Sequence, residues 1–123
     1  MRIFKVKSFV RFSQKEAIHD DSLRNAVTEL SAGKFDADLG GGLYKQRVAR
    51  PQSGKSGGYR VLVCFKQGNR SFFVHGFAKS AKANISPTEK ADLKKLAKVF
   101  FAMTDDELAK LIQSGSLQEI SEE

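Results

Sequence analysis

The sequence predicts an α+β fold in which helices pack against a small, twisted, mainly antiparallel β-sheet of about four strands. Three observations lead to this prediction. Segments with strand-like patterns follow one another in the middle of the chain, glycine-containing turns separate them, and amphipathic helical patterns lie on both sides. The length of 123 residues suits one domain. We expect that domain at residues 1–115, with N-terminal helices on one face of the sheet, followed by an acidic, disordered tail at 116–123.

The N-terminal part predicts one strand and one or two helices. Charged and apolar residues alternate in Arg2–Lys7, as in a half-buried strand. Ser8–Ala17 fits either a short helix or a continuation of that strand. A longer helix begins after an N-cap at Asp20 or Asp21 and ends near Gly33, a position that favours glycine. Its buried face is formed by residues at helical spacing: Leu23, Ala26, Val27 and Leu30.

Three strands follow the glycine-rich connector Lys34–Gly42. We expect them at Leu43–Ala49, Tyr59–Lys66 and Arg70–Lys79, the last two joined by a hairpin turn at residues 67–69. The strand Tyr59–Lys66 is apolar on both faces, so it belongs in the middle of the sheet. Cys64 lies inside this apolar run and is expected to be a small buried core residue.

Two helices are predicted at the C-terminal end, each from a capping box. Ser86 and Glu89 form the first box, with Pro87 at the first helical position. Thr104 and Glu107 form the second, and its helix ends at Gly115.

Several classes of protein are disfavoured. The N-terminus has no uninterrupted apolar segment typical of a signal peptide. No segment reaches the roughly 20 apolar residues of a membrane span, so we expect a cytoplasmic protein. One Cys and two distant His give no metal-ligand spacing, and no metal or other cofactor is expected.

The distribution of charge predicts an anionic partner. The chain has a formal net charge of +7, yet no Asp or Glu occurs from Leu39 to Thr88, where nine Lys and Arg lie. Nucleic acid is the commonest polyanion that such a segment binds. A solvated basic surface without a partner is the alternative, and the length of the acid-free segment argues against it.

The segment Ala49–Ser56 matches a relaxed phosphate-binding-loop pattern, in which Gly-Lys-Ser ends the motif. That loop requires a helix directly after the Lys-Ser, because the helix N-terminus holds the phosphates. Two glycines and a strand pattern follow here. We therefore reject a nucleotide hydrolase.

The basic residues are expected to gather at one edge of the sheet. Lys45 and Arg47 lie on the same face of their strand, since side chains alternate with a period of two. Arg60 begins the neighbouring strand, and Lys79 and Lys82, at and just after the end of the third strand, are within reach. Such a cluster is suited to holding one phosphodiester from several sides.

Three segments, YKQRVAR, SGGYRVLV and GFAKSAKANIS, resemble the core of the RelE/ParE superfamily of type II toxins. The resemblance covers roughly Leu23–Leu96 and is strongest to the phage-associated, RelE-like branch. It implies a groove on one side of the sheet and a metal-independent mRNA endonuclease (mRNA interferase) that acts in the ribosomal A site and stops translation. It also implies a cognate antitoxin, often a helix-turn-helix protein.

The resemblance carries over to individual residues. Lys45 and Arg47 match the paired basic positions of the family, Arg60 matches the arginine that contacts the scissile phosphate, and Lys79 matches the basic residue that ends the last strand. Arg50 and Lys55 are not part of this match and are expected to bind RNA as additional basic residues.

Two positions depart from the family. The family has an arginine where this chain has Ser80, and Lys82 is the nearest substitute. It has a base-stacking tyrosine where this chain has Ser86, so Tyr44 and Phe77 are the remaining candidates for stacking and RNA binding.

In the expected reaction the 2′-hydroxyl of RNA is the nucleophile. The two arginines stabilise the charge on phosphorus, Lys45 or His75 acts as base, and Lys79 or Lys82 assists the leaving group. His75 also fits a hydrogen-bonded histidine on a packed face. A gyrase-poisoning toxin of the ParE type and a non-catalytic nucleic-acid-binding protein are the alternatives.

Overall fold

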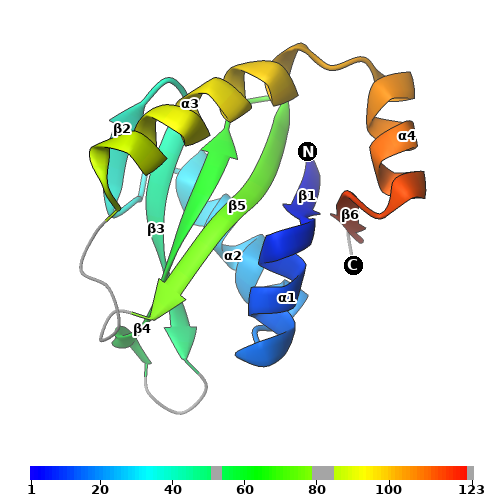
Figure 1. Cartoon of the computed structure of the whole chain (residues 1–123). Coiled ribbons are helices and arrows are strands. Elements are labelled where there is room, and N and C mark those ends of the chain that lie inside the picture. Colours follow the sequence, from blue (N-terminus) through cyan, green and yellow to red (C-terminus); the bar gives the residue numbers. More distant parts are fainter. Residues whose placement is uncertain (51–53, 79–84, 122–123) are drawn as a thin grey trace.

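A computed structural model describes residues 1–50, 54–78 and 85–121; the side chains of Arg50 and residues 54–57 also lie outside the description. It consists of one sheet and four helices (Figure 1). The elements are β1 (Arg2–Val6), α1 (Lys7–Lys15), α2 (Asp20–Ser31), β2 (Ala37–Gly40), β3 (Leu43–Arg50), β4 (Gly54–Phe65), β5 (Arg70–Ala78), α3 (Pro87–Ala102), α4 (Asp105–Ser114) and β6 (Leu117–Ile120).

The six strands lie in the order β2-β3-β4-β5-β1-β6. All neighbouring pairs are antiparallel except β1 and β5, which are parallel. The α+β class and the central position of β4 are confirmed, but the expected number of about four strands is too low. β2 lies in the predicted connector and β6 in the predicted tail. Both are four-residue edge strands. β6 pairs with β1 at the other end of the chain, and no local sequence pattern indicates that contact.

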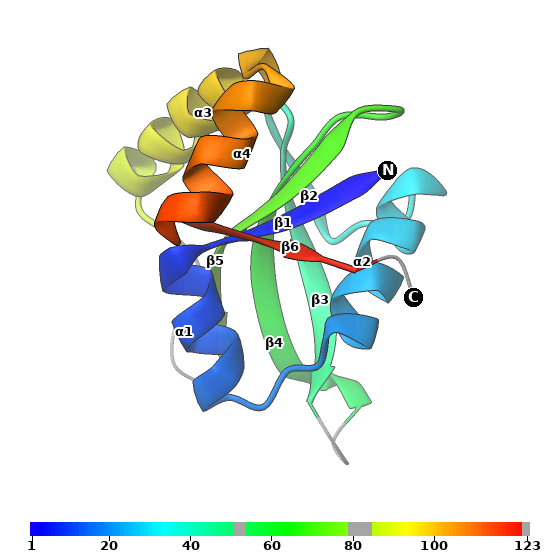
Figure 2. The same cartoon turned by 90° about the vertical axis from the view of Figure 1, so that its right-hand side faces the viewer.

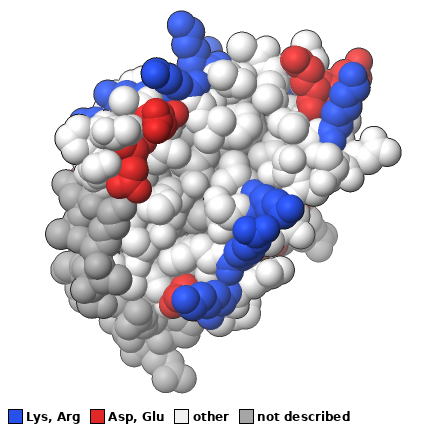
Figure 3. Space-filling model, viewed as in Figure 1, with Lys and Arg blue, Asp and Glu red and all other residues white. Residues whose placement is uncertain are grey.

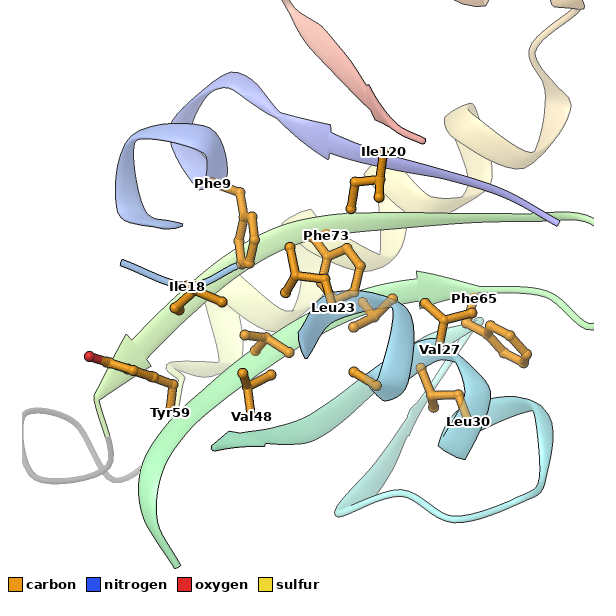
Figure 4. Close-up of a cluster of buried hydrophobic side chains, with 13 residues drawn as sticks. Phe9, Ile18, Leu23, Val27, Leu30, Val48, Tyr59, Phe65, Phe73 and Ile120 are labelled. Atoms are coloured by element: carbon orange, nitrogen blue, oxygen red, sulfur yellow. The ribbon is translucent and has the colours of Figure 1, made fainter. Parts of the chain in front are cut away.

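Helices cover both faces of the sheet. Figure 2 shows α2 on one side of the strands and α3 and α4 on the other. One cluster of buried side chains joins α1 and α2 to the sheet, including Phe9, Leu23 and Phe73 (Figure 4). A second cluster joins α3 and α4 to the other face, including Phe4, Phe72 and Phe100. The C-terminal helices therefore cover part of the face on which the resemblance implies a groove.

Cys64 belongs to this second cluster and is fully buried, as expected. Burial raises the pKa of its thiol to about 12. The thiol is consequently a small apolar core group and not a nucleophile.

The helix boundaries follow from local hydrogen bonds. Both predicted capping boxes are present, with Ser86 accepting from the amide of Glu89 at 3.1 Å and Thr104 accepting from that of Glu107 at 3.1 Å. Gly115 ends α4 with a φ of 84°. Among the described helices, none is both long enough and apolar enough to cross a membrane.

The N-terminal helices show one correction. Residues 7–15 are helical, which decides between the two alternatives for this segment. The N-cap of α2 is His19 and neither of the two aspartates. Asp20 and Asp21 lie in the first turn, where their carboxylates pair with Lys5 and Arg24 instead of capping the backbone.

Candidate functional site

Three of the predicted catalytic cations lie together on one face of the sheet. It is the face against which α3 and α4 pack, and the cations lie beyond the part that these helices cover. In the register of β3 and β4, Arg47 lies opposite Arg60, and Lys45 lies opposite Leu62 of the second core cluster. Residues opposite each other in an antiparallel pair share a face. The expectation that Lys45 and Arg47 share a face is confirmed, and Arg60 is their direct neighbour.

All three cations surround one carboxylate, that of Asp36. Its Oδ1 lies 3.1 Å from Nε of Arg47, and its Oδ2 lies 3.5 Å from Nε of Arg60 and 3.6 Å from Nζ of Lys45. Asp36 precedes β2, whose tight glycine turn folds the chain back beside β3. The three cations therefore converge on the volume of a single small anion.

Asp36 was not predicted from the sequence. It lies three residues before the acid-free segment, in what was expected to be a connector. Its position before a glycine-rich reversal was the available signal, because such a reversal brings an upstream residue alongside the strand that follows.

The three cations differ in exposure. The side chain of Arg60 is only 9% exposed, that of Lys45 is 18% exposed and that of Arg47 is 49% exposed. The Nη1 atom of Arg60 is buried and has no hydrogen-bond partner among the described residues. A buried guanidinium with an available donor is suited to binding an oxyanion, because desolvated charge interacts strongly.

His75 and Phe77 share this face. Phe77 is buried and lies opposite Arg60 in β4, and His75 is half-buried and lies opposite Leu62. Their rings are 5.9 Å apart. Gly76, between them, lies against the ring of Phe12 on the other face, where a Cβ atom would come within 2.4 Å of it. Phe12 therefore holds β5 closely against α1 beneath the site.

Tyr44, which is predicted to bind RNA, does not lie with the cations. Its side chain packs with Phe35 and Phe65 on the α2 face of the sheet, with ring centroids 5.1 and 5.9 Å away. It precedes Lys45 directly in the strand, and neighbouring side chains of a strand point to opposite faces.

The remaining predicted residues are described only in part. Lys79 and Lys82 lie outside the described residues. Arg50 and Lys55 are in β3 and β4, but their side chains lie outside the description. β4 begins at Gly54, earlier than predicted, so a strand and not a helix contains the Lys55-Ser56 pair. This confirms the rejection of the phosphate-binding loop.

A second group of basic residues was missed in the sequence. Lys7, Arg11 and Lys15 are exposed on α1 at intervals of four residues, and Figure 3 shows Lys and Arg side chains in a row across this helix. The helical spacing was the signal, but it has meaning only once the segment is known to be a helix.

Groups of three or more potential metal ligands are absent from the part of the chain that the structure describes. The site consists of lysine and arginine side chains around one carboxylate.

Comparison with known proteins identifies the family. The profile of the family described as "RelE toxin of RelE / RelB toxin-antitoxin system" matches residues 1–120. No curated protein matches the chain. The family match covers nearly the whole chain, includes every element from β1 to β6, and implies an antitoxin as partner. The chain therefore belongs to the RelE toxin family and is a toxin of a toxin–antitoxin system.

Proposed function

We propose that this toxin is a ribosome-dependent endoribonuclease that cleaves mRNA in the A site and thereby inhibits translation, without a metal ion. The observation that supports it best is the convergence of Lys45, Arg47 and Arg60 on a single carboxylate. A carboxylate and a phosphodiester present similar oxygen acceptors, and arginine binds both with its planar donor group.

The reaction needs few groups, because RNA carries its own nucleophile. The 2′-oxygen forms a bond to phosphorus, the bond from phosphorus to the 5′-oxygen breaks, and a 2′,3′-cyclic phosphate and a 5′-hydroxyl result. Arg47 and Arg60 stabilise the negative charge of the pentavalent phosphorane. Lys45 or His75 removes the 2′-proton, and Lys79 or Lys82 supplies a proton to the leaving oxygen.

Two partners are proposed besides the mRNA: ribosomal RNA and an antitoxin. The row of basic residues on α1 is suited to binding the phosphate backbone of ribosomal RNA, because a row of lysine and arginine side chains binds polyanions without sequence preference. We also propose that the antitoxin is a protein with a helix-turn-helix domain. Phe77, a buried aromatic residue beside Arg60 on the cation face, is a candidate for stacking on a base.

The central test is the substitution Arg60→Ala. Purified wild-type protein is added to translating ribosomes, and mRNA ends are mapped by primer extension. We expect A-site cleavage, and a loss of about 10²- to 10³-fold in the variant, as for removal of one transition-state donor. Arg60→Lys keeps the charge but not the planar donor group, and we expect most of the activity to be lost there too. Lys110→Ala, which removes an exposed cation of α4, is the matched control and should cleave normally.

Parallel assays separate the other functions. The same proteins are incubated with free RNA, and with gyrase and plasmid DNA. Undiminished cleavage and growth arrest by the Arg60→Ala variant would refute the proposed role of the cluster. Gyrase inhibition without mRNA cleavage would identify a gyrase poison, and salt-dependent retention on RNA without cleavage would identify a binding protein.

A further inference from the structure

We propose that Asp36 is a positioning residue, which holds Arg47 and Arg60 in the orientation that receives the scissile phosphate. The inference rests on the proposed ribonuclease function and adds a residue to its site. Asp36 contributes through the two arginines and is not itself assigned to the reacting atoms.

Both arginines use the same atom of the guanidinium group, Nε, to contact the carboxylate. Each arginine approaches Asp36 with its Nε atom, Arg47 at Oδ1 and Arg60 at Oδ2. The terminal nitrogens of both side chains are left out of these contacts, and Nη1 of Arg60 has no hydrogen-bond partner within the described residues. A guanidinium held along its Nε edge keeps its terminal N–H groups for a second anion.

The main chain at Asp36 is itself held by hydrogen bonds to β3. The amide of Asp36 donates to the carbonyl of Lys45 at 3.0 Å. Gln46, which is buried, donates from Nε2 to the carbonyl of Lys34 at 2.8 Å. These bonds tie the segment before β2, from Lys34 to Asp36, to β3. Groups that must be oriented for catalysis are typically supported by such a rigid outer shell.

The negative charge of Asp36 also reduces the repulsion among the three cations. Lys45, Arg47 and Arg60 would repel one another in this small volume without an anion, and Arg60 has little contact with solvent to reduce the repulsion. Asp36 offsets that repulsion in the free toxin. It leaves the described cluster with three cations and one anion, so the site still attracts a phosphate.

The opposite role, in which Asp36 blocks the site as an internal substitute for the phosphate, predicts the opposite result. A blocking carboxylate lowers activity, so its removal would raise kcat/KM. A positioning carboxylate raises kcat, while its negative charge weakens the ground-state binding of RNA. Its removal therefore lowers kcat and lowers KM or leaves it unchanged.

The test is Asp36→Asn, which preserves shape and removes the charge. We expect kcat for A-site cleavage to fall about 10- to 100-fold, the range for misplaced catalytic groups. We expect KM for the ribosome–mRNA complex to fall by up to about fivefold, the effect of removing one nearby charge. The matched control is Asp38→Asn, an exposed aspartate two residues further whose carboxylate accepts a hydrogen bond from the amide of Gly40. It should leave both constants unchanged.

A second measurement does not depend on activity. The Nε–Hε signals of Arg47 and Arg60 are recorded by NMR in wild-type, Asp36→Asn and Asp38→Asn proteins. We expect both signals to shift and their hydrogen exchange to accelerate only in the Asp36 variant. Unchanged Hε signals in Asp36→Asn would overturn the inference, as would an unchanged kcat or a rise in kcat/KM. A wild-type protein that does not cleave mRNA would refute the proposed function alone, with the NMR result still deciding the role of Asp36.

Discussion

The ion pair between Lys5 and Asp20 leads to a prediction about the stability of the fold. Lys5 lies in β1, and its Nζ is 2.8 Å from Oδ1 of Asp20, the first residue of α2. The lysine side chain is 9% exposed and the aspartate side chain 43% exposed. Removing either partner therefore has unequal consequences, because only the lysine would remain as a buried charge without a partner.

The exposures give the expected magnitudes. Asp20→Ala leaves the buried ammonium unpaired, and we expect a loss of about 3 kcal/mol in the free energy of unfolding, at the lower end of the range for breaking buried pairs. Lys5→Met removes the charge and keeps the apolar stem, while Asp20 remains hydrated at a helix N-terminus. We expect a loss of at most about 1 kcal/mol there. The double variant should be more stable than Asp20→Ala alone.

The assay is urea unfolding followed by circular dichroism at constant pH and salt, with unchanged m-values as the condition for comparison. Asp21→Ala is the control, because Asp21 lies in the same helical turn, is 82% exposed and pairs with Arg24. It measures the loss of negative charge at the helix N-terminus, for which we expect less than about 1 kcal/mol. The reasoning is wrong if Lys5→Met destabilises as much as Asp20→Ala, or if the double variant is no more stable than Asp20→Ala.

Three further predictions follow from the described contacts. The hydrogen bond from Arg2 holds the pKa of Glu119 below its usual value, so the contribution of this pair to stability is present above the ordinary glutamate pKa. This contribution should disappear as the pH falls through the lowered pKa. Glu119→Gln should lack this part of the acid dependence when the free energy of unfolding is measured in urea across pH. Parallel curves of unfolding free energy against pH for the two proteins would contradict the prediction. Because burial raises the pKa of Cys64 to about 12, Ellman's reagent at neutral pH should modify the native thiol only as the protein opens, and urea should accelerate the reaction; rapid stoichiometric modification without urea would refute this. Gly76→Ala would place its Cβ 2.4 Å from the ring of Phe12 and should destabilise by about 1–3 kcal/mol in thermal unfolding, with partial recovery on adding Phe12→Leu; an unchanged Tm would show that the ring moves freely.

The positions of the two groups of cations have different physical origins. Arg47 and Arg60 meet because two strands pair in one register, and a shift of that register by one residue would turn one of them to the other face. The row on α1 depends only on helical spacing. Mutations that disturb the β3–β4 pairing should therefore affect the cluster around Asp36 more than the basic surface of α1.

Local interactions explain what was predictable. Both C-terminal helices begin at the residues expected, because a capping box is closed by side chains three residues apart. The common face of Lys45 and Arg47 follows from the two-residue period of a strand. The same alternation places Tyr44 on the other face, so the sequence already indicated that Tyr44 would not join the two cations.

The α+β class, the capped C-terminal helices, the central apolar strand and the basic residues of one strand face were predictable, since these depend on patterns within a few residues. Three features became visible only in the folded chain: Asp36 lies among three cations, residues 7–15 form a helix packed on Phe73, and residues 117–120 pair with β1. Each of these depends on contacts between segments distant in sequence, and no local periodicity records which segments will meet.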